Sequence, residues 1–237
     1  VAKTMITEIF QKKAALIVTS AFTTWYVMLI SIFNMAGRIM WASASDYIGR
    51  KNTYYCFFIL GIILYSSIPI SAQTFDIAPV IVWIILFYGA TLIIFTMYGG
   101  GFATIPAYLA DMFGTKYVGG IHGRLLTAWS TAGVLGPVII TSLRGSSINN
   151  AINDLAAKVD PQVFLDKFGA SINSLDELVK AKTVTIQNLL EILPPGTPDP
   201  TSQVYNKTMI VMACLLGIAL IANFLVKPVN TRHHMRN

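Results

Sequence analysis

The chain has 237 residues, of which 54% are hydrophobic and only 12% are charged, against about 25% charged residues in an ordinary soluble domain. This composition excludes a water-soluble globular protein, because a domain of this size could not hide so much apolar surface from water. The net charge of +6 does not indicate nucleic-acid binding, since the flanks of apolar runs hold most of the lysine and arginine and no basic stripe is interleaved with aromatic residues.

Long apolar runs dominate the chain, and a helix needs about 20 residues to cross the hydrocarbon core of a bilayer. In lipid each run must be helical to satisfy its own backbone, so the expected fold class is all-α, a polytopic transmembrane helical bundle. Transmembrane helices are expected at about 14–37, 52–75, 77–110, 121–143 and 207–227. Residues 1–13 are expected to hold the end of a truncated helix and an outer loop, because Val1 is neither an initiator Met nor part of a charged leader.

The junction after the first of these runs predicts a tight reversal between two helices with a charged group beside it. Gly49 lacks a Cβ and permits a tight reversal between two helices, and a carboxylate near a helix N-terminus is stabilised by about 0.3 to 1 kcal/mol. Asp46 is the candidate carboxylate. Arg38, Arg50 and Lys51 are the cations nearby. The alternative, that Arg50 and Lys51 only anchor the loop beside the cytoplasmic membrane surface, stays open.

The third run is too long for one perpendicular crossing, so its helix is expected to tilt, kink or project beyond the lipid. Gly99, Gly100 and Gly101 favour close helix packing as the first interpretation and a hinge as the second, with Pro106 as a further kink position.

The distribution of cations predicts the orientation, because cytoplasmic loops carry the excess of Lys and Arg. The cations expected on the cytoplasmic side are Arg38, Arg50, Lys51, Lys116, Arg124, Lys227, Arg232 and Arg236. Residues 144–206 then form an extracytoplasmic insertion, and 228–237 form a cytoplasmic tail.

The insertion is expected to be folded, because apolar residues recur regularly among its acidic ones. Asp160 before Pro161 predicts a helix N-cap, and Ser174 with Glu177 predicts a capping box, so short amphipathic helices are expected. The proline-rich stretch 194–200 is expected to be an extended return to the last span.

Polar and aromatic side chains inside the spans are candidates to line a solute path, because such groups face a protein interior or a wet cavity more often than lipid. The main candidates are Tyr98, Trp129, Ser130, Thr127, Trp25 and Asn34; Thr24, Tyr88 and Thr131 belong to the same group. A surface position is expected for His122, and buried free thiols are expected for Cys56 and Cys214. No catalytic, metal-binding or cofactor motif stands out, so an enzyme is not expected.

Two stretches of the sequence resemble a known family. Residues 37–51 resemble the loop motif of the major facilitator superfamily, which is a glycine, three residues, an aspartate, a basic residue, any residue, a glycine and then Arg or Lys. They depart from it at Ala42 and Tyr47. The resemblance implies a conformational latch, whose expected residues are Asp46, Gly49, Arg50, Lys51 and Arg38. Residues 98–119, followed by 121–124, are similar to the oxalate/formate antiporter family of that superfamily. The resemblance implies the C-terminal six-helix half of a major facilitator fold, with about five complete spans present.

The resemblance also implies a function. The expected function is that of a membrane transporter half that moves small organic anions, of the carboxylate class, by alternating-access antiport or proton symport. The expected partner is the missing N-terminal half, in the same chain or as a separate subunit. The alternative is a non-transporting structural subunit of a membrane complex. The expected location is the bacterial plasma membrane, with the mitochondrial inner membrane as the alternative.

One substitution relative to the family bears on the solute. Oxalate carriers of the family are expected to place a lysine one turn after the aromatic residue of the eleventh helix, and that position, three residues after Trp129, is Ala132 here. A dianion without such a cation is costly to desolvate. The sequence therefore favours a monocarboxylate, or an anion whose charge is met by the missing half.

Overall fold

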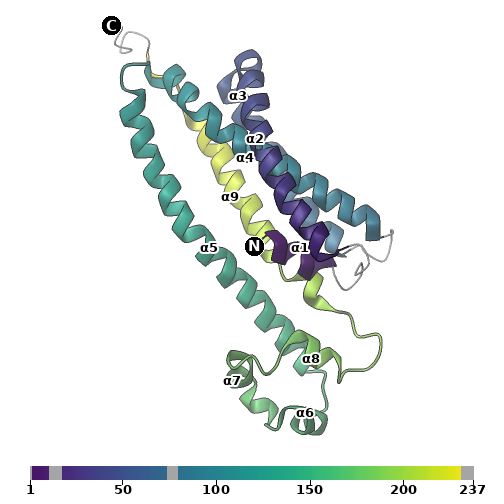
Figure 1. The fold of residues 1–237 in the computed structure, drawn as a ribbon. Helices are drawn as coiled ribbons and strands as arrows, with labels where there is room; N and C mark the ends of the chain where they lie inside the picture. The colour runs from purple at the N-terminus through teal and green to yellow at the C-terminus, as the bar shows by residue number, and fades with distance from the viewer. Residues whose placement is uncertain (1, 11–17, 74–79, 231–237) are drawn as a thin grey trace. The chain divides into compact units, whose positions relative to one another are not determined.

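The computed structural model describes residues 2–10, 18–73 and 80–230, and these residues form helices joined by short connections (Figure 1). Within this part of the chain, five helices are long and apolar enough to cross a membrane. The long helices are α2 (Ser20–Ile48), α3 (Arg50–Gln73), α4 (Val80–Phe113), α5 (Val118–Ala156) and α9 (Asn206–Leu225); α1 (Ala2–Phe10) precedes them. The expectation of an all-α polytopic bundle is confirmed. The expected helix ends at residues 14, 75 and 77, residues 11–13 of the expected outer loop and residues 231–237 of the expected tail lie outside the described residues.

The chain divides into two compact units, residues 1–137 with 209–237 and residues 138–208. The first unit holds α1 to α4, the first part of α5 and nearly all of α9. The second holds the rest of α5 and the short helices of the segment expected outside the membrane.

Helices α2 and α4 approach each other closely in the first unit because glycine replaces larger side chains at their contact. A Cβ at Gly37 would overlap the backbone of Thr96, and a Cβ at Gly99 would overlap the backbone of Asn34. Polar side chains join the same two helices, since Tyr26 Oη donates to Thr91 Oγ1 at 2.9 Å. Gly99 therefore has a packing role, which is the first of the two interpretations that the sequence left open.

The junction between α2 and α3 consists of one residue, Gly49. Its φ of 87° lies in the region that favours glycine, and its N–H donates to the Ser45 carbonyl at 3.1 Å. The tight reversal is thus present. However, α2 extends to Ile48 and does not end near 37, because a single charged residue ends an apolar run without ending a helix. Arg38 therefore lies inside a long helix.

Helices α4 and α5 run further than the apolar pattern suggested. α4 continues through Gly99–Gly101 and Pro106 to Phe113. α5 has 39 residues and ends at Ala156, beyond the expected end at 143, which gives it a length of about 58 Å at the helical rise per residue. Because the hydrocarbon core is about 30 Å thick, α5 is long enough to project well beyond it.

The second unit has an apolar core of its own. The buried side chains come from the end of α5, from the short helices α6 (Pro161–Phe168) and α8 (Ile186–Leu190) and from the connection before α8. Figure 1 shows α6 and α8 close together with α7 (Leu175–Lys180). The buried side chains include Leu155, Phe164, Val184 and Leu189, none more than 3% exposed. Arg144 Nε donates to Tyr205 Oη at 3.1 Å and ties α5 to the segment before α9.

Two capping predictions in this unit have different outcomes. Asp160 caps α6 as expected, since its Oδ1 accepts from the Gln162 N–H at 2.8 Å and Pro161 follows. The capping box at Ser174 is wrong, because the side chain of Ser174 makes no capping hydrogen bond. A short 3-10 helix, Ile172–Ser174, precedes α7 and takes Ser174 out of the extended conformation that such a cap needs.

The proline-rich stretch remains outside the helices as far as Asp199. The carboxylate of Asp199 accepts from the Thr201 N–H at 3.0 Å and begins the 3-10 helix Pro200–Gln203. The chain then enters α9 at Asn206.

Candidate functional site

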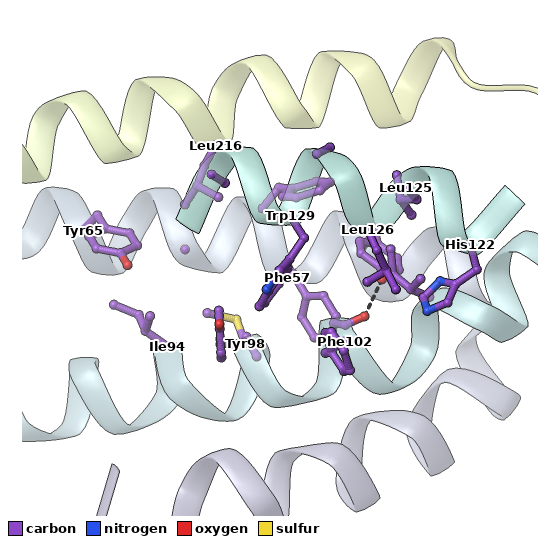
Figure 2. A pocket seen from close by; sticks show the side chains of 18 residues that line it. Phe57, Tyr65, Ile94, Tyr98, Phe102, His122, Leu125, Leu126, Trp129 and Leu216 are labelled. Atoms are coloured by element: carbon purple, nitrogen blue, oxygen red, sulfur yellow. Dashed lines mark hydrogen bonds between the residues drawn. The ribbon is translucent and has the colours of Figure 1, made fainter. Parts of the chain in front are cut away.

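A pocket of about 500 Å³ lies in the first unit between α3, α4, α5 and α9 (Figure 2). Its walls are mostly aromatic and aliphatic, and no lysine or arginine is among the described residues that line it. The residues that line the pocket are Tyr54, Phe57, Phe58, Gly61, Tyr65, Ile94, Met97, Tyr98, Gly101, Phe102, Ile105, His122, Leu125, Leu126, Ala128, Trp129, Ala132 and Leu216. A pocket of this volume and composition is typical of small-molecule sites between the helices of a bundle.

Two of the residues singled out in the sequence meet in this pocket. The ring of Trp129, from α5, lies 5.4 Å from that of Tyr98 and 5.2 Å from that of Phe102, both from α4. Figure 2 shows these rings in the middle of the pocket, with Tyr65 at one end and His122 at the other. Ala132, one turn after Trp129, is also part of the lining.

The remaining candidates of the solute path are not part of the lining. Ser130 and Thr127 lie on exposed parts of α5 and donate to backbone carbonyls of their own helix, at 3.1 and 2.6 Å. Trp25 is 62% exposed, and Asn34 lies at the contact of α2 with Gly99. A role for these four residues in a solute path stays a prediction.

Arg38 has a position that the sequence interpretation missed. It lies on α2 about 15 Å before the C-terminal end of that helix, at the helical rise per residue. Its guanidinium carbon is 5.8 Å from the centre of the Phe102 ring, within the range of a cation–π contact. Arg38 was expected among the latch residues. In the structure its cation–π partner is Phe102, which lines the pocket.

His122 was expected at the surface, and it lines the pocket instead. Its Nδ1 is buried and has no hydrogen-bond partner in the described structure. The signal in the sequence was faint, because the residue follows two glycines and precedes an arginine, which is also how a surface helix start looks. The structure places it one turn inside α5, which begins at Val118.

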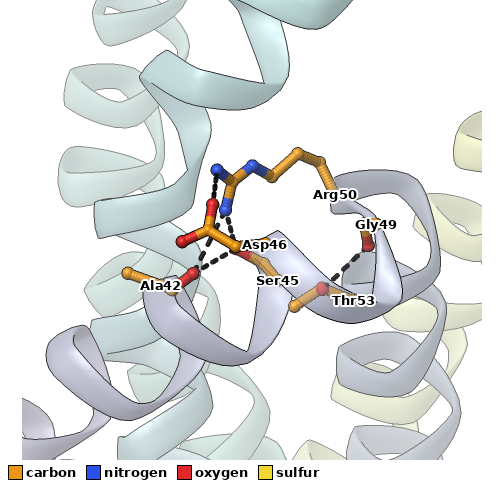
Figure 3. Close-up of polar contacts among 6 residues, drawn as sticks. All are labelled: Ala42, Ser45, Asp46, Gly49, Arg50 and Thr53. Carbon is orange, nitrogen blue, oxygen red and sulfur yellow. Dashed lines mark hydrogen bonds and ion pairs between the residues drawn. The ribbon is translucent and has the colours of Figure 1, made fainter.

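Two of the expected latch residues, Asp46 and Arg50, form a polar cluster at the end of α2 (Figure 3). Arg50 is ion-paired with Asp46, donates to Ser45 Oγ, and donates to the Ala42 carbonyl at 3.1 Å. Ser45 is buried, and the Asp46 side chain is 60% exposed. An exposed pair of this kind contributes only about 0.3 to 0.5 kcal/mol to stability, so its importance for a latch has to come from a change in partners between conformations.

Lys51 contacts a different element from its neighbour Arg50. Its Nζ donates to the carbonyls of Val226 and Phe224, at 2.7 and 3.3 Å, at the C-terminal end of α9. The last carbonyls of a helix lack intrahelical partners and carry the negative end of the helix dipole, so a cation there is stabilising.

Asn223, which is 6% exposed, strengthens the same junction. Its side-chain amide donates to the Lys51 carbonyl at 3.4 Å, and its Oδ1 accepts from Tyr108 Oη at 2.9 Å. The ends of α3, α4 and α9 are therefore tied together. The sequence gave no reason to single out this asparagine, since it is one polar residue in an apolar run.

Taken together, the long apolar helices and the pocket between them define a polytopic helical membrane protein. Over 110 residues the chain is 30% identical to the oxalate:formate antiporter of Oxalobacter formigenes. The matched segment is 46% of this chain and 24% of that protein, so the chain spans about a quarter of the length of this relative. No family model matches the chain, and no solved structure matches it.

Proposed function

We propose that the chain is the C-terminal half of an alternating-access transporter for small organic anions, in a major facilitator arrangement. The position of Arg38 is the observation that carries the proposal. This cation belongs to a helix long enough to span a membrane, and its guanidinium lies against an aromatic residue of the pocket wall. Ionisable residues within membrane helices are expensive to keep and mark solute or ion paths by default. The similarity to an antiporter supports the same function.

The number of cations near the pocket favours solutes with one negative charge. Arg38 lies beside Phe102, and the position at which the resemblance implies a lysine is Ala132, a lining residue without charge. A second carboxylate would have to be desolvated without a partner from this half. Monocarboxylates are therefore the proposed solutes, exchanged for one another or carried with a proton, in the bacterial plasma membrane.

Alternating access needs a second wall, which the proposal assigns to an N-terminal half that rocks against this one. The cluster of Asp46 and Arg50 is the proposed latch, with residues 144–206 on the extracytoplasmic side. Gly101, at the pocket wall, is the proposed hinge position among the three glycines.

Counterflow in proteoliposomes tests the proposal. The full-length gene product is reconstituted, the vesicles are loaded with unlabelled formate, acetate or oxalate, and uptake of the labelled acid is followed. Saturable counterflow of a monocarboxylate supports transport. The absence of counterflow with every acid, from protein that is folded and inserted, contradicts it and favours the structural-subunit alternative.

A further inference from the structure

We propose that the pocket between α3, α4, α5 and α9 binds an aryl monocarboxylate, with the ring against the side chains of Phe57, Tyr98 and Trp129 and the carboxylate at the His122 end. The proposal rests on the transport function above, because it names the class of solute that this site accepts. It goes beyond that function in giving the solute an apolar, aromatic body.

The walls of the pocket are the first reason. A one- or two-carbon acid would leave most of the 500 Å³ unfilled and would exchange its hydration for hydrocarbon contacts. An acid with an apolar body gains from the removal of that body from water. Aromatic rings also prefer edge-to-face or offset contacts with other rings, and the rings of Tyr98 and Trp129, 5.4 Å apart, already show such spacing.

The polarity of the pocket is the second reason, because it has one end suited to an acid. Figure 2 shows His122 at the end opposite Tyr65 and Ile94. In the described structure the His122 Nδ1 is buried without a partner, and a buried polar atom in that condition is unfavourable. An imidazole N–H can donate to a carboxylate, which would supply the missing hydrogen bond.

The third reason is the charge nearby. Arg38 does not line the pocket, but its guanidinium lies against Phe102, which does. A carboxylate at the His122 end would meet the imidazole, with the Arg38 charge against the Phe102 ring in the middle of the pocket. A second carboxylate at the Tyr65 end would meet the Tyr65 hydroxyl, apolar side chains and no charged group of the lining. The pocket therefore matches a solute that is charged at one end only.

Binding measurements on the full-length protein in lipid nanodiscs test the proposal. The probes are phenylacetate and benzoate, compared with acetate, oxalate and octanoate; octanoate carries the same acid group on the kind of chain that a membrane fatty acid supplies. Phenylacetate is expected to bind at least about tenfold more tightly than acetate and oxalate. Equal affinities for phenylacetate and acetate overturn the proposal, and so does a preference for octanoate, which would assign the pocket to a lipid chain.

Variants locate the binding. Ala132→Phe fills the pocket and is expected to weaken phenylacetate binding at least about tenfold, whereas Val134→Phe, at an exposed position outside the lining of the same helix, leaves it unchanged. His122→Ala is expected to weaken binding, and His122→Gln, which keeps a side-chain donor, to restore part of it. Equal effects of the two phenylalanine substitutions, or no effect of His122→Ala, contradict the site.

The two proposals fail separately. Counterflow of formate or acetate without any binding of aryl acids removes the aryl solute and leaves the transport function. Tight binding of phenylacetate without counterflow of any acid keeps the site and removes transport.

Discussion

The contact between α2 and α4 supports a prediction that separates the two roles left open for the glycines of α4. At Gly99 a Cβ would overlap the backbone of Asn34, and at Gly101 a Cβ would meet only the Phe57 ring, at 3.8 Å, an ordinary contact. The two positions lie two residues apart on one helix, so Gly99→Ala and Gly101→Ala add the same methyl group to the same element with different consequences.

The size of the expected change in stability depends on which atoms have to move to make room for the new methyl group. A flexible side chain can yield to a new methyl group, but the Asn34 carbonyl is part of the α2 backbone, so Gly99→Ala must separate the two helices. Overpacking of this kind typically costs about 1 to 3 kcal/mol, which is about a 5- to 150-fold change in the folding equilibrium. Gly101→Ala is expected to stay within about 0.5 kcal/mol of the parent.

Unfolding of the purified protein by SDS in mixed micelles, followed by circular dichroism, measures both values. Equal stability of Gly99→Ala and the parent would refute the close contact of α2 and α4. The same two variants test the hinge, because a hinge at Gly101 predicts that Gly101→Ala lowers the rate of counterflow while leaving stability unchanged.

Three further predictions concern polar and charged positions. Asp46→Asn is expected to lower the turnover of counterflow much more than the affinity for solute, because the exposed pair with Arg50 acts on a conformational equilibrium. The free energy of unfolding is expected to change by no more than about 0.5 kcal/mol. Unchanged turnover would contradict the latch. Lys51→Ala is expected to increase hydrogen exchange of the backbone amides at the end of α9, because the carbonyls of Phe224 and Val226 lose their donor. The control variant Lys116→Ala is expected to leave this exchange unchanged. Equal exchange in both variants would contradict the contact. Ala132→Lys adds a cation to the pocket lining and is expected to shift the ratio of oxalate to acetate counterflow toward oxalate; a constant ratio shows that position 132 does not meet the solute.

The apolar pattern predicted the number of spans and the helical fold, because hydrophobicity sets where a chain can enter lipid. It did not predict where the helices end. Arg38 ended the first run without ending α2, and α5 continued to Ala156 through a stretch whose polar residues belong to the second unit. Helix ends depend on caps and on tertiary contacts, of which only the Gly49 reversal and the Asp160 cap were visible in the sequence.

In the candidate site, too, the sequence predicted some features and not others. Tyr98 and Trp129 could be singled out as aromatic residues within spans, and the structure brings them into contact. Ser130 and Thr127 shared the polar signal, but their hydroxyls donate to carbonyls of their own helix and neither residue lines the pocket. The positions of His122 and Asn223 follow only from packing across helices that are distant in sequence.

The most direct test of the account compares two arginines. Counterflow of a labelled monocarboxylate is measured for Arg38→Gln and for Arg124→Gln. Both arginines are exposed and lie outside the lining, and Arg38 differs in its contact with the lining residue Phe102. If Arg38 supplies the charge for the solute, Arg38→Gln abolishes saturable counterflow in protein that inserts and folds as the parent does, and Arg124→Gln retains it. Parent-like counterflow in Arg38→Gln would contradict the assignment of the anion path to this pocket.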